Sequence, residues 1–448
     1  MASPPGDETH RPQFHFTAAS GWLNDPNGLL YYDGEYHMFF QYHPSCEPDD
    51  LKYWGHAISR DLVHWQETAP AIAPEHGVGV WSGSAVVDVE NRSGLQTGRD
   101  KVLLAFFTGF ADPVTQHMAY SNDRGRTWVR YPSNPVLGHI KGGNRDPKVF
   151  WYAPRNAWIM VLYTDGNEYQ FFSSPDARKW THLSDLVVPG CAECPDFFQM
   201  ALDGDRHNKR WVFVGGNGHY MIGDFDGSRF TPKAGPFQAD YGGNYYATQT
   251  FNDIPESDGR RIQIAWMAWG RYPGMPFNQQ MNFPCEMTLR TFAEGLRLCR
   301  TPVREIALLH KSEHAWNNRV LKPGHNILAD LAGELFDIRA ECELRAAAEF
   351  GIKCRGTAVS YSVREEKVSC LGGCVGLKPS IGRIRLQVLL DRTSIEVFGN
   401  DGEAVMSSCF LPEAGDKSLE TYATAGSVGI VSLRVFELSS ALPRPPGT

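Results

Sequence analysis

The feature that most constrains the fold is a unit that recurs five times in the first 300 residues. Each unit opens with a polar cluster and continues as a strand-like run, a turn and a second strand-like run. The openings lie roughly 50 to 63 residues apart, a period typical of the four-stranded blade of a β-propeller. They are Asn24-Asp25-Pro26, Ser82-Gly83-Ser84, Arg145-Asp146-Pro147, Glu193-Cys194-Pro195 and Tyr245-Tyr246-Ala247. The sequence therefore predicts an all-β fold that begins with a five-bladed β-propeller.

A repeat of this kind also predicts where its polar openings meet. If each opening lies at the start of the innermost strand of a blade, all five converge on one end of a central channel. Asp25, Asp146 and Glu193 would then share a site although they are far apart in the chain. Pro26 favours extended geometry at Asp25, and Asn27-Gly28 predicts a tight turn before a strand at residues 29–32.

The character of the chain changes after residue 300. Alternating apolar and polar residues at 384–390 and 394–398, with a turn at Asn400-Asp401-Gly402, are typical of a β-sandwich. We therefore expect a catalytic propeller over residues 1–300 and a sandwich over residues 301–448. The second region has no comparable acidic clusters, so we expect it to contribute packing and some substrate binding.

Charge and hydropathy restrict the partners. The 448 residues have a formal net charge of −8, which argues against nucleic acid or an anionic membrane as the main partner. No apolar run approaches the 18 or so residues of a membrane span. The start of the chain is polar and acidic, unlike a signal peptide, so we expect a cytoplasmic protein or a secreted one whose export signal has been removed. Cell location and oligomeric state, including a homo-oligomer, stay open.

The ten cysteines are dispersed through the chain, unlike those of a small disulfide-rich scaffold. Cys191 and Cys194 have the spacing of a zinc half-site, but the Cys370/Cys374 pair does not, and no His-x3-His accompanies them. We expect no metal.

Three acids in a pocket with many aromatic residues suit glycoside hydrolysis, in which one carboxylate attacks or shields a cationic sugar carbon and a protonated acid releases the leaving oxygen. Asp25, held by Pro26, is the better candidate for the nucleophile. Glu193 lies between Ala192 and Cys194, a setting of low polarity that favours a protonated acid. Asp146 beside Arg145 should stay ionised and bind sugar hydroxyls. The alternative for each acid alone is a structural carboxylate that accepts backbone hydrogen bonds.

Six motifs, in order, resemble those of glycoside hydrolase family 32, which contains invertases, exo-inulinases, levanases and fructan exohydrolases. They are Trp22-Leu23-Asn24-Asp25-Pro26-Asn27-Gly28, Phe39-Phe40-Gln41-Tyr42, Trp54-Gly55-His56-Ala57, Ser82-Gly83-Ser84-Ala85, Arg145-Asp146-Pro147 and Glu193-Cys194-Pro195. The resemblance implies a five-bladed propeller followed by a sandwich, no metal or organic cofactor, and a retaining mechanism on β-D-fructofuranosides. It implies that Asp25 is the nucleophile, Glu193 the acid/base and Asp146 the transition-state stabiliser.

The resemblance also implies a set of residues that bind the terminal fructose. They are Asn24, Gln41, Trp54, Trp81, Ser82 and Arg145, with Trp266 or Trp269 as a further wall. Some positions depart from the family pattern: His43 stands where Asn is usual, Asn144 where Phe is common and Cys285 where Arg is usual. We expect these departures to border the leaving-group side of the site.

The first hypothesis is an exo-acting β-fructofuranosidase that releases fructose from levan or inulin ends and also cleaves sucrose. A dedicated invertase and a fructosyltransferase are the nearest alternatives, and a non-catalytic sugar-binding propeller is a remote one. An inverting five-bladed hydrolase acting on arabinosides is a further rival, because inversion needs carboxyls about 6.5–9.5 Å apart and retention about 5–5.5 Å. The sequence does not decide linkage or chain-length preference.

Overall fold

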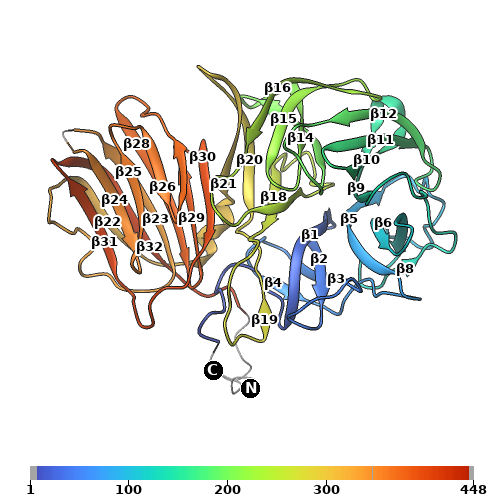
Figure 1. Ribbon diagram of the computed structural model, residues 1–448, viewed down its shortest axis with the longest axis horizontal. Coiled ribbons are helices and arrows are strands. Elements are labelled where there is room, and N and C mark those ends of the chain that lie inside the picture. Colours follow the sequence, from blue (N-terminus) through green and yellow to red (C-terminus); the bar gives the residue numbers. More distant parts are fainter. Residues whose placement is uncertain (1–7, 346, 443–448) are drawn as a thin grey trace.

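A computed structural model describes residues 8–345 and 347–442 of the chain, and the regular secondary structure of these residues is almost entirely β-strand, which confirms the all-β prediction. Figure 1 shows two lobes, one built from strands β1–β21 and the other from β22–β32. The helical elements in the described residues are two short 3-10 turns, η1 (Ala153–Arg155) and η2 (Arg304–Leu309). None of the helices in the described part of the chain is long and apolar enough to cross a membrane.

The first lobe contains antiparallel four-stranded units in chain order. The first unit has β1 (Gly21–Tyr32), β2 (Glu35–His43), β3 (Tyr53–Ser59) and β4 (Trp65–Glu67). The second has β5 (Gly79–Asp88), β6 (Val102–Phe110), β7 (Thr115–Ser121) and β8 (Val129–Arg130). The third has β9 (Arg145–Tyr152), β10 (Ala157–Asp165), β11 (Glu168–Ser174) and β12 (Thr181–Val187).

The remaining strands of this lobe form one larger sheet. β13 (Asp196–Leu202), β14 (Asp205–Val214), β15 (His219–Phe225) and β16 (Phe230–Gln238) follow the same antiparallel order as the earlier units. β17 (Tyr246–Thr250), β18 (Arg261–Trp266), β20 (Cys285–Phe292) and β21 (Gly295–Pro302) complete it. The two groups are joined where β13 pairs in parallel with β20 at Leu202 and Leu289. The short β19 (Phe277–Asn278) instead pairs in parallel with β1.

The first strands of the successive units lie next to one another. β5 contacts both β1 and β9, and β17 contacts both β1 and β13. β9 is tied to β13 by a fully buried ion pair, in which Lys148 Nζ lies 2.8 Å from Asp196 Oδ1. Buried amides add further links, because Asn252 donates to the carbonyls of Ala85 and Val149. The first strands of the units are therefore neighbours, as the predicted convergence of the openings requires.

The second lobe is a pair of sheets packed face to face. One sheet has the order β22-β32-β23-β28-β29-β30, with β22 (His310–Leu321), β32 (Val428–Leu438), β23 (Phe336–Glu343), β28 (Arg383–Asp391), β29 (Ser394–Gly399) and β30 (Ala404–Cys409). The other has the order β27-β26-β25-β24-β31, with β27 (Gly373–Gly376), β26 (Lys367–Cys370), β25 (Thr357–Ser362), β24 (Glu349–Cys354) and β31 (Leu419–Thr424).

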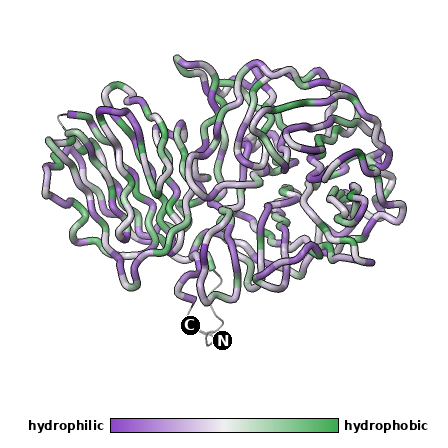
Figure 2. The backbone as a smooth tube through the Cα atoms, viewed as in Figure 1, coloured by the Kyte–Doolittle hydropathy of each residue, from purple (hydrophilic) through white to green (hydrophobic). Residues whose placement is uncertain are grey.

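Alternation along the strands explains why these sheets pack together. In β28 the inward residues Ile384, Leu386 and Val388 are buried, whereas the residues between them are partly exposed. They share one core with Ile352 and Val359 of the facing sheet. Figure 2 shows the hydrophilic and hydrophobic segments interspersed along these strands. This arrangement is a β-sandwich.

The two lobes meet at a buried polar network that we call the interlobe network. Its members are His15, Asp240, Arg300, Asp391, Glu396 and Ser407. His15 donates from its two ring nitrogens to Asp391 Oδ2 and Glu396 Oε2, each 2.9 Å away. Arg300 forms an ion pair with Asp240, and Ser407 Oγ lies within hydrogen-bond distance of both Asp240 Oδ2 (2.8 Å) and Glu396 Oε1 (3.1 Å). The sandwich is therefore joined to the first lobe by charged groups that are excluded from water.

Candidate active site

Asp25 lies within β1, in a stretch where the pairing with β2 is irregular. The register shifts between Leu23 and Pro26 and again between Asn27 and Leu30. The sequence predicted a tight turn before the strand, and this is wrong: the strand begins at Gly21 and continues through the motif as a double bulge. Gly28 has a φ of 52°, and a Cβ there would lie 2.7 Å from the Phe39 ring. The bulge is what turns Asp25 out of the sheet ladder.

Two side chains orient the Asp25 carboxylate. Asn24 Nδ2 donates to Oδ1 at 2.9 Å, and Ser82 Oγ donates to Oδ2 at 2.5 Å. Asn24 is itself fixed, because its amide oxygen accepts a hydrogen bond from Trp22 Nε1 at 2.8 Å. Charge-assisted hydrogen bonds of this kind fix both the position and the rotamer of a carboxylate. Asp25 is thus held by the openings of β1 and β5 together.

Asp146 and Glu193 both have left-handed backbone conformations. Asp146 has a φ of 64°, Glu193 of 51° and the next residue, Cys194, of 34°. Such values are uncommon for residues other than glycine and cost free energy unless the surrounding structure enforces them. Ala247, in the fifth opening, has a φ of 52°, so three of the five strand openings contain such a residue.

The three acids Asp25, Asp146 and Glu193, which we call the acid cluster, lie around Cys194. Its thiol lies 3.5 Å from Asp25 Oδ2 and 3.4 Å from Asp146 Oδ2, so both carboxylates contact the same sulfur. Its backbone N–H donates to Asp146 Oδ2 at 2.9 Å. Burial and the neighbouring carboxylates raise the pKa of this thiol, so Cys194 acts as a neutral donor.

The environment of Asp146 differs from the expectation based on its neighbour Arg145. Burial raises the pKa of Asp146 to about 7, and the nearby Asp25 and Glu193 carboxylates add to the rise against the opposing effect of Arg145. The Arg145 Nε atom lies 3.9 Å from Asp146 Oδ2, too far for a hydrogen bond. Arg145 favours the ionised form, as predicted, but the cost of burying the charge outweighs this attraction, so the Asp146 carboxyl takes up a proton more readily than an ordinary aspartate.

Glu193 is surrounded by donors rather than by the apolar groups that its sequence neighbours suggested. Its Oε1 atom contacts Arg145 Nη2, and its Oε2 atom accepts a hydrogen bond of 2.6 Å from Tyr246 OH. Burial, followed by the hydrogen bond to Glu193, raises the pKa of Tyr246, which keeps the phenol a donor. Arg145 also lies over the Tyr163 ring, 4.6 Å from its centroid. The Glu193 carboxyl is thus fixed at both oxygens.

Tyr246 is the site residue that the motif analysis missed. Its position in the fifth opening, equivalent to those of the acids, was the available signal. Its ring lies 5.7 Å from that of Trp269 and 6.3 Å from that of Trp266, measured between centroids. Trp269 is 63% exposed, whereas Trp266 is nearly buried and donates to Gln279. Of the two predicted tryptophans, Trp269 is the exposed one, and it lies beside Tyr246.

The other predicted binding residues divide into two groups. Trp81 is half-buried and stacks on Phe110 with centroids 3.8 Å apart. Gln41 and Trp54 are buried, and they donate to the carbonyls of Val80 and Trp81 at 3.0 and 2.9 Å. Trp54 has 0% exposure, so its ring lies behind the surface of the site in this structure. Both residues support the β5 opening from beneath.

Comparison with known proteins identifies the family. The pattern for the glycosyl hydrolases family 32 N-terminal domain matches residues 15–302, and that for the family's C-terminal domain matches residues 305–437. This chain belongs to glycosyl hydrolase family 32. It is therefore a glycoside hydrolase, as the motif series predicted.

Relatives within family 32 resemble the chain over almost all of its length. A levanase of Bacillus subtilis (strain 168) is 38% identical over 98% of this chain and 72% of its own length. A levanase of Bacillus sp. (strain L7) is 34% identical over 96% of this chain, which spans about half (52%) of that longer protein. The crystal structure of exo-inulinase from Aspergillus awamori superposes with a TM-score of 0.89 at 27% identity, covering 98% of this chain and 100% of the other.

Two of the departures from the family-32 pattern lie away from solvent. Asn144 is fully buried, and its amide oxygen accepts a hydrogen bond from the Ile140 backbone. Cys285 is also fully buried and donates to the carbonyl of Phe283. The expectation that these two residues border the leaving group is therefore wrong. His43 does lie near the surface, beside Asp49.

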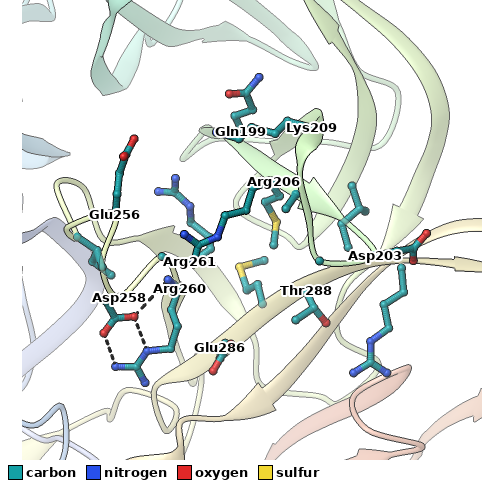
Figure 3. Close-up of a pocket in the computed structure, with 18 of the residues that line it drawn as sticks. Gln199, Asp203, Arg206, Lys209, Glu256, Asp258, Arg260, Arg261, Glu286 and Thr288 are labelled. Carbon is teal, nitrogen blue, oxygen red and sulfur yellow. Dashed lines mark hydrogen bonds and ion pairs between the residues drawn. The ribbon is translucent and has the colours of Figure 1, made fainter.

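A cavity of about 840 Å³ lies elsewhere in this family-32 enzyme (Figure 3). It lies where β13 ends and β18 begins, and none of the acid cluster lines it. The ion pair between Arg260 and Asp258 forms part of its wall. The acid cluster lies near the strand openings, whereas the β13 residues that line this cavity are Gln199, Met200 and Ala201, toward the other end of the strand. This cavity is distinct from the candidate active site.

No group of three His, Cys, Asp or Glu side chains in residues 8–345 and 347–442 is arranged to hold a metal ion.

Proposed function

We propose that this family-32 enzyme is a retaining, exo-acting β-fructofuranosidase that releases terminal fructose from levan or inulin and also cleaves sucrose. The observation that carries the proposal is the acid cluster itself. Acids from residues 25, 146 and 193 gather around one cysteine and one arginine, at the openings of three different strands. The levanase and exo-inulinase names of the relatives support fructans as substrates.

In the proposed mechanism Asp25 attacks the anomeric carbon of the terminal fructose. Asn24 and Ser82 hold its carboxylate in one rotamer, so little freedom is lost when the covalent fructosyl-enzyme forms. Glu193 delivers a proton to the leaving oxygen, which departs with the rest of the chain or with glucose. Glu193 then takes a proton from water, which attacks the intermediate and releases fructose with its configuration retained.

Asp146 has a separate role in the proposal. Its carboxyl, buried beside Asp25, binds sugar hydroxyls and stabilises the positive charge that develops on the ring. Arg145 links this carboxyl to Glu193, with which it forms an ion pair. Trp81 and Trp269 supply aromatic faces for the sugar, and the buried Gln41, Trp54 and Trp266 support the walls from behind.

We further propose that the first lobe is a five-bladed propeller and that the boundary with the sandwich lies at residues 300 and 301. The five strand openings and the cyclic contacts among β1, β5, β9, β13 and β17 support five blades. The family's N- and C-terminal domain patterns meet between residues 302 and 305, close to this boundary. A closed ring explains how one residue from each of several openings reaches the same site.

Product analysis tests the proposed activity. The protein is incubated separately with levan, inulin and sucrose, and the products are resolved by chromatography over time. Exo-hydrolysis predicts fructose as the sole small product from both fructans, and fructose with glucose from sucrose. Difructose dianhydrides or longer oligomers would contradict hydrolysis from the chain end, and sucrose cleavage alone would identify a dedicated invertase.

A further inference from the structure

The segment 240–246 runs along the edge strand β30 of the sandwich before it enters the site. Tyr241 N donates to Val405 O at 2.8 Å, and Asn244 N donates to Ser407 O at 3.0 Å. Side chains add two bonds in the opposite direction: Ser407 N donates to Asp240 Oδ1 at 2.9 Å and Cys409 N to Asn244 Oδ1 at 2.8 Å. The segment therefore occupies an edge of the sandwich sheet that would otherwise be unpaired.

The contact with β30 is close enough to require glycine. A Cβ at Gly242 would lie 2.1 Å from Ser407 O and 2.5 Å from Ser407 N. Below this contact, Asp240 forms a buried ion pair with Arg300, which lies over the ring of Tyr245 at 4.3 Å. The backbone on both sides of Asn244 is thus fixed by the interlobe network, and its position depends on the sandwich.

Asn244 connects this docked segment to the aromatic wall of the site. Its amide nitrogen donates to the carbonyl of Ala268, the residue before Trp269, while its amide oxygen accepts from β30. Trp269 has a φ of 65°, a left-handed conformation that neighbouring contacts must hold in place. Two residues after Asn244, Tyr246 donates its hydroxyl to Glu193 at 2.6 Å. One side chain therefore bridges the sandwich, the Trp269 turn and the strand that carries Tyr246.

We propose that Asn244 is a positioning residue. Through Asn244, the edge strand β30 of the sandwich holds Tyr246 against Glu193, and it also holds Trp269 in place at the edge of the site. This inference rests on the proposed role of Glu193 as acid/base. It makes the sandwich a component of the catalytic unit as well as a packing partner. The hydrogen bonds of the Asn244 side chain go to Ala268 and Cys409 and not to the acids, so its effect on the reaction is transmitted mainly by Tyr246.

The Asn244→Ala variant tests the inference. Because Glu193 must be protonated to release the leaving group, loss of the Tyr246 donor to its carboxylate moves the alkaline limb of the kcat/KM profile to higher pH. We expect kcat/KM for sucrose to fall about tenfold, as for one charge-assisted hydrogen bond lost from the transition state. Arg145, Asp25 and Asp146, which also face Glu193, are unchanged in this variant.

Asn326→Ala is the matched control. Asn326 lies in the sandwich and, like Asn244, bridges backbone groups: it donates to Leu419 O and accepts from Leu328 N and Thr421 N. We expect its melting temperature to fall about as much as that of Asn244→Ala while its kcat/KM and pH profile stay those of the wild type. Equal kinetics in the two variants would overturn the inference.

A double-mutant cycle shows whether Asn244 acts through Tyr246. We expect Tyr246→Phe to reduce kcat/KM about tenfold, and Asn244→Ala to cause little further loss in the Tyr246→Phe background. Fully additive losses would contradict transmission through Tyr246. The concentration of active enzyme is titrated first in each variant, so the comparison also holds if Asn244→Ala is partly unfolded. If the wild type cleaves no fructoside at all, the proposed function fails, and this outcome is distinct from an active wild type with silent variants.

Discussion

Asp146 of the acid cluster and Asp391 of the interlobe network are both buried aspartates, yet their surroundings differ sharply. Asp391 accepts hydrogen bonds from the His15 ring and from the backbone N–H groups of Gln13, Phe14, His15 and Arg392. Burial by itself would raise the pKa of Asp391. These donors have the larger effect, and they lower its pKa to below the usual range of an aspartate. Asp146 has few donors and two neighbouring acids, and its pKa rises to about 7.

This difference separates a structural network from a reactive one. In the interlobe network each carboxylate is matched by a cation or by several N–H groups, so the buried charges are neutralised where they stand. In the acid cluster, Arg145 is the cation that pairs with the acids, and a neutral thiol fills the space between two of them. Carboxyls with too few partners are available to bind the hydroxyls of a substrate and to stabilise the positive charge that develops in its transition state.

The largest expected effect comes from removing the nucleophile. Asp25→Asn should lower kcat by about 10⁴-fold or more, since no other group can form the covalent intermediate. The amide keeps the shape of the side chain and one acceptor, so the melting temperature should stay close to that of the wild type. Initial rates on sucrose and a thermal melt measure both quantities, and retained activity would refute the role of Asp25.

The matching change in the interlobe network should act on stability instead. Asp391→Asn removes one of the two carboxylates that pair with the buried His15 cation and leaves Glu396 as the other, and we expect a loss of about 3–5 kcal/mol in unfolding free energy. Activity per folded molecule at low temperature should persist. Asp401→Asn is the control, because Asp401 pairs with Arg385 at the exposed surface and such pairs contribute about 0–1 kcal/mol. Denaturant unfolding measures both, and similar losses would contradict the contrast.

Asp146→Asn should combine lower activity with higher stability. Loss of a charge that stabilises the transition state should reduce kcat by about 10²–10³-fold. Because the pKa of Asp146 is raised from 3.8 to about 7, its contribution to stability is present below about pH 4 and is lost as the pH rises through 7. The amide of the variant carries no charge at either pH, so the variant does not suffer this loss. Its melting temperature should therefore exceed that of the wild type at pH 8 but not at pH 4. A melting temperature below that of the wild type at pH 8 would contradict this account.

A smaller effect is expected in the pH dependence of the wild type. Burial lowers the pKa of His15, but hydrogen bonds and attraction from Asp391 and Glu396 outweigh it and raise the pKa to about 9. The stability that the His15 cation provides is therefore complete below pH 6.5 and is lost as the pH rises through 9. This amounts to about 3 kcal/mol. Melts from pH 6 to 10 should show the decline, and His15→Gln should lack it.

Much of the site could be predicted from the sequence because the repeat places one polar cluster at the start of each unit. This periodicity brought Asp25, Asp146 and Glu193 together without any knowledge of the strands between them. The burial of Trp54 and the raised pKa of Asp146 could not be predicted, since both depend on how neighbouring strands exclude water. The hydrogen bond from Tyr246 depends on a side-chain direction that a motif does not specify.

The sequence shows a change of character near residue 300, but it does not show the contact between the lobes. His15 pairs with Asp391 and Glu396, and Asp240 pairs with Arg300, across sequence separations that carry no periodic signal. In the sequence Gly242 has the features of an ordinary loop glycine, whereas the structure shows that β30 packs directly against it. Contacts of this kind arise from the packing of complete sheets, so they follow from the tertiary structure alone.

The stereochemistry of transfer to methanol tests the central claim most directly. With methanol present during sucrose cleavage, attack by Asp25 followed by a second displacement predicts methyl β-D-fructofuranoside, which is stable and can be identified by NMR. The product should form at early times and be absent with Asp25→Asn. Methyl α-D-fructofuranoside as the first product would show inversion, and it would contradict both the covalent intermediate and the roles proposed for Asp25 and Glu193.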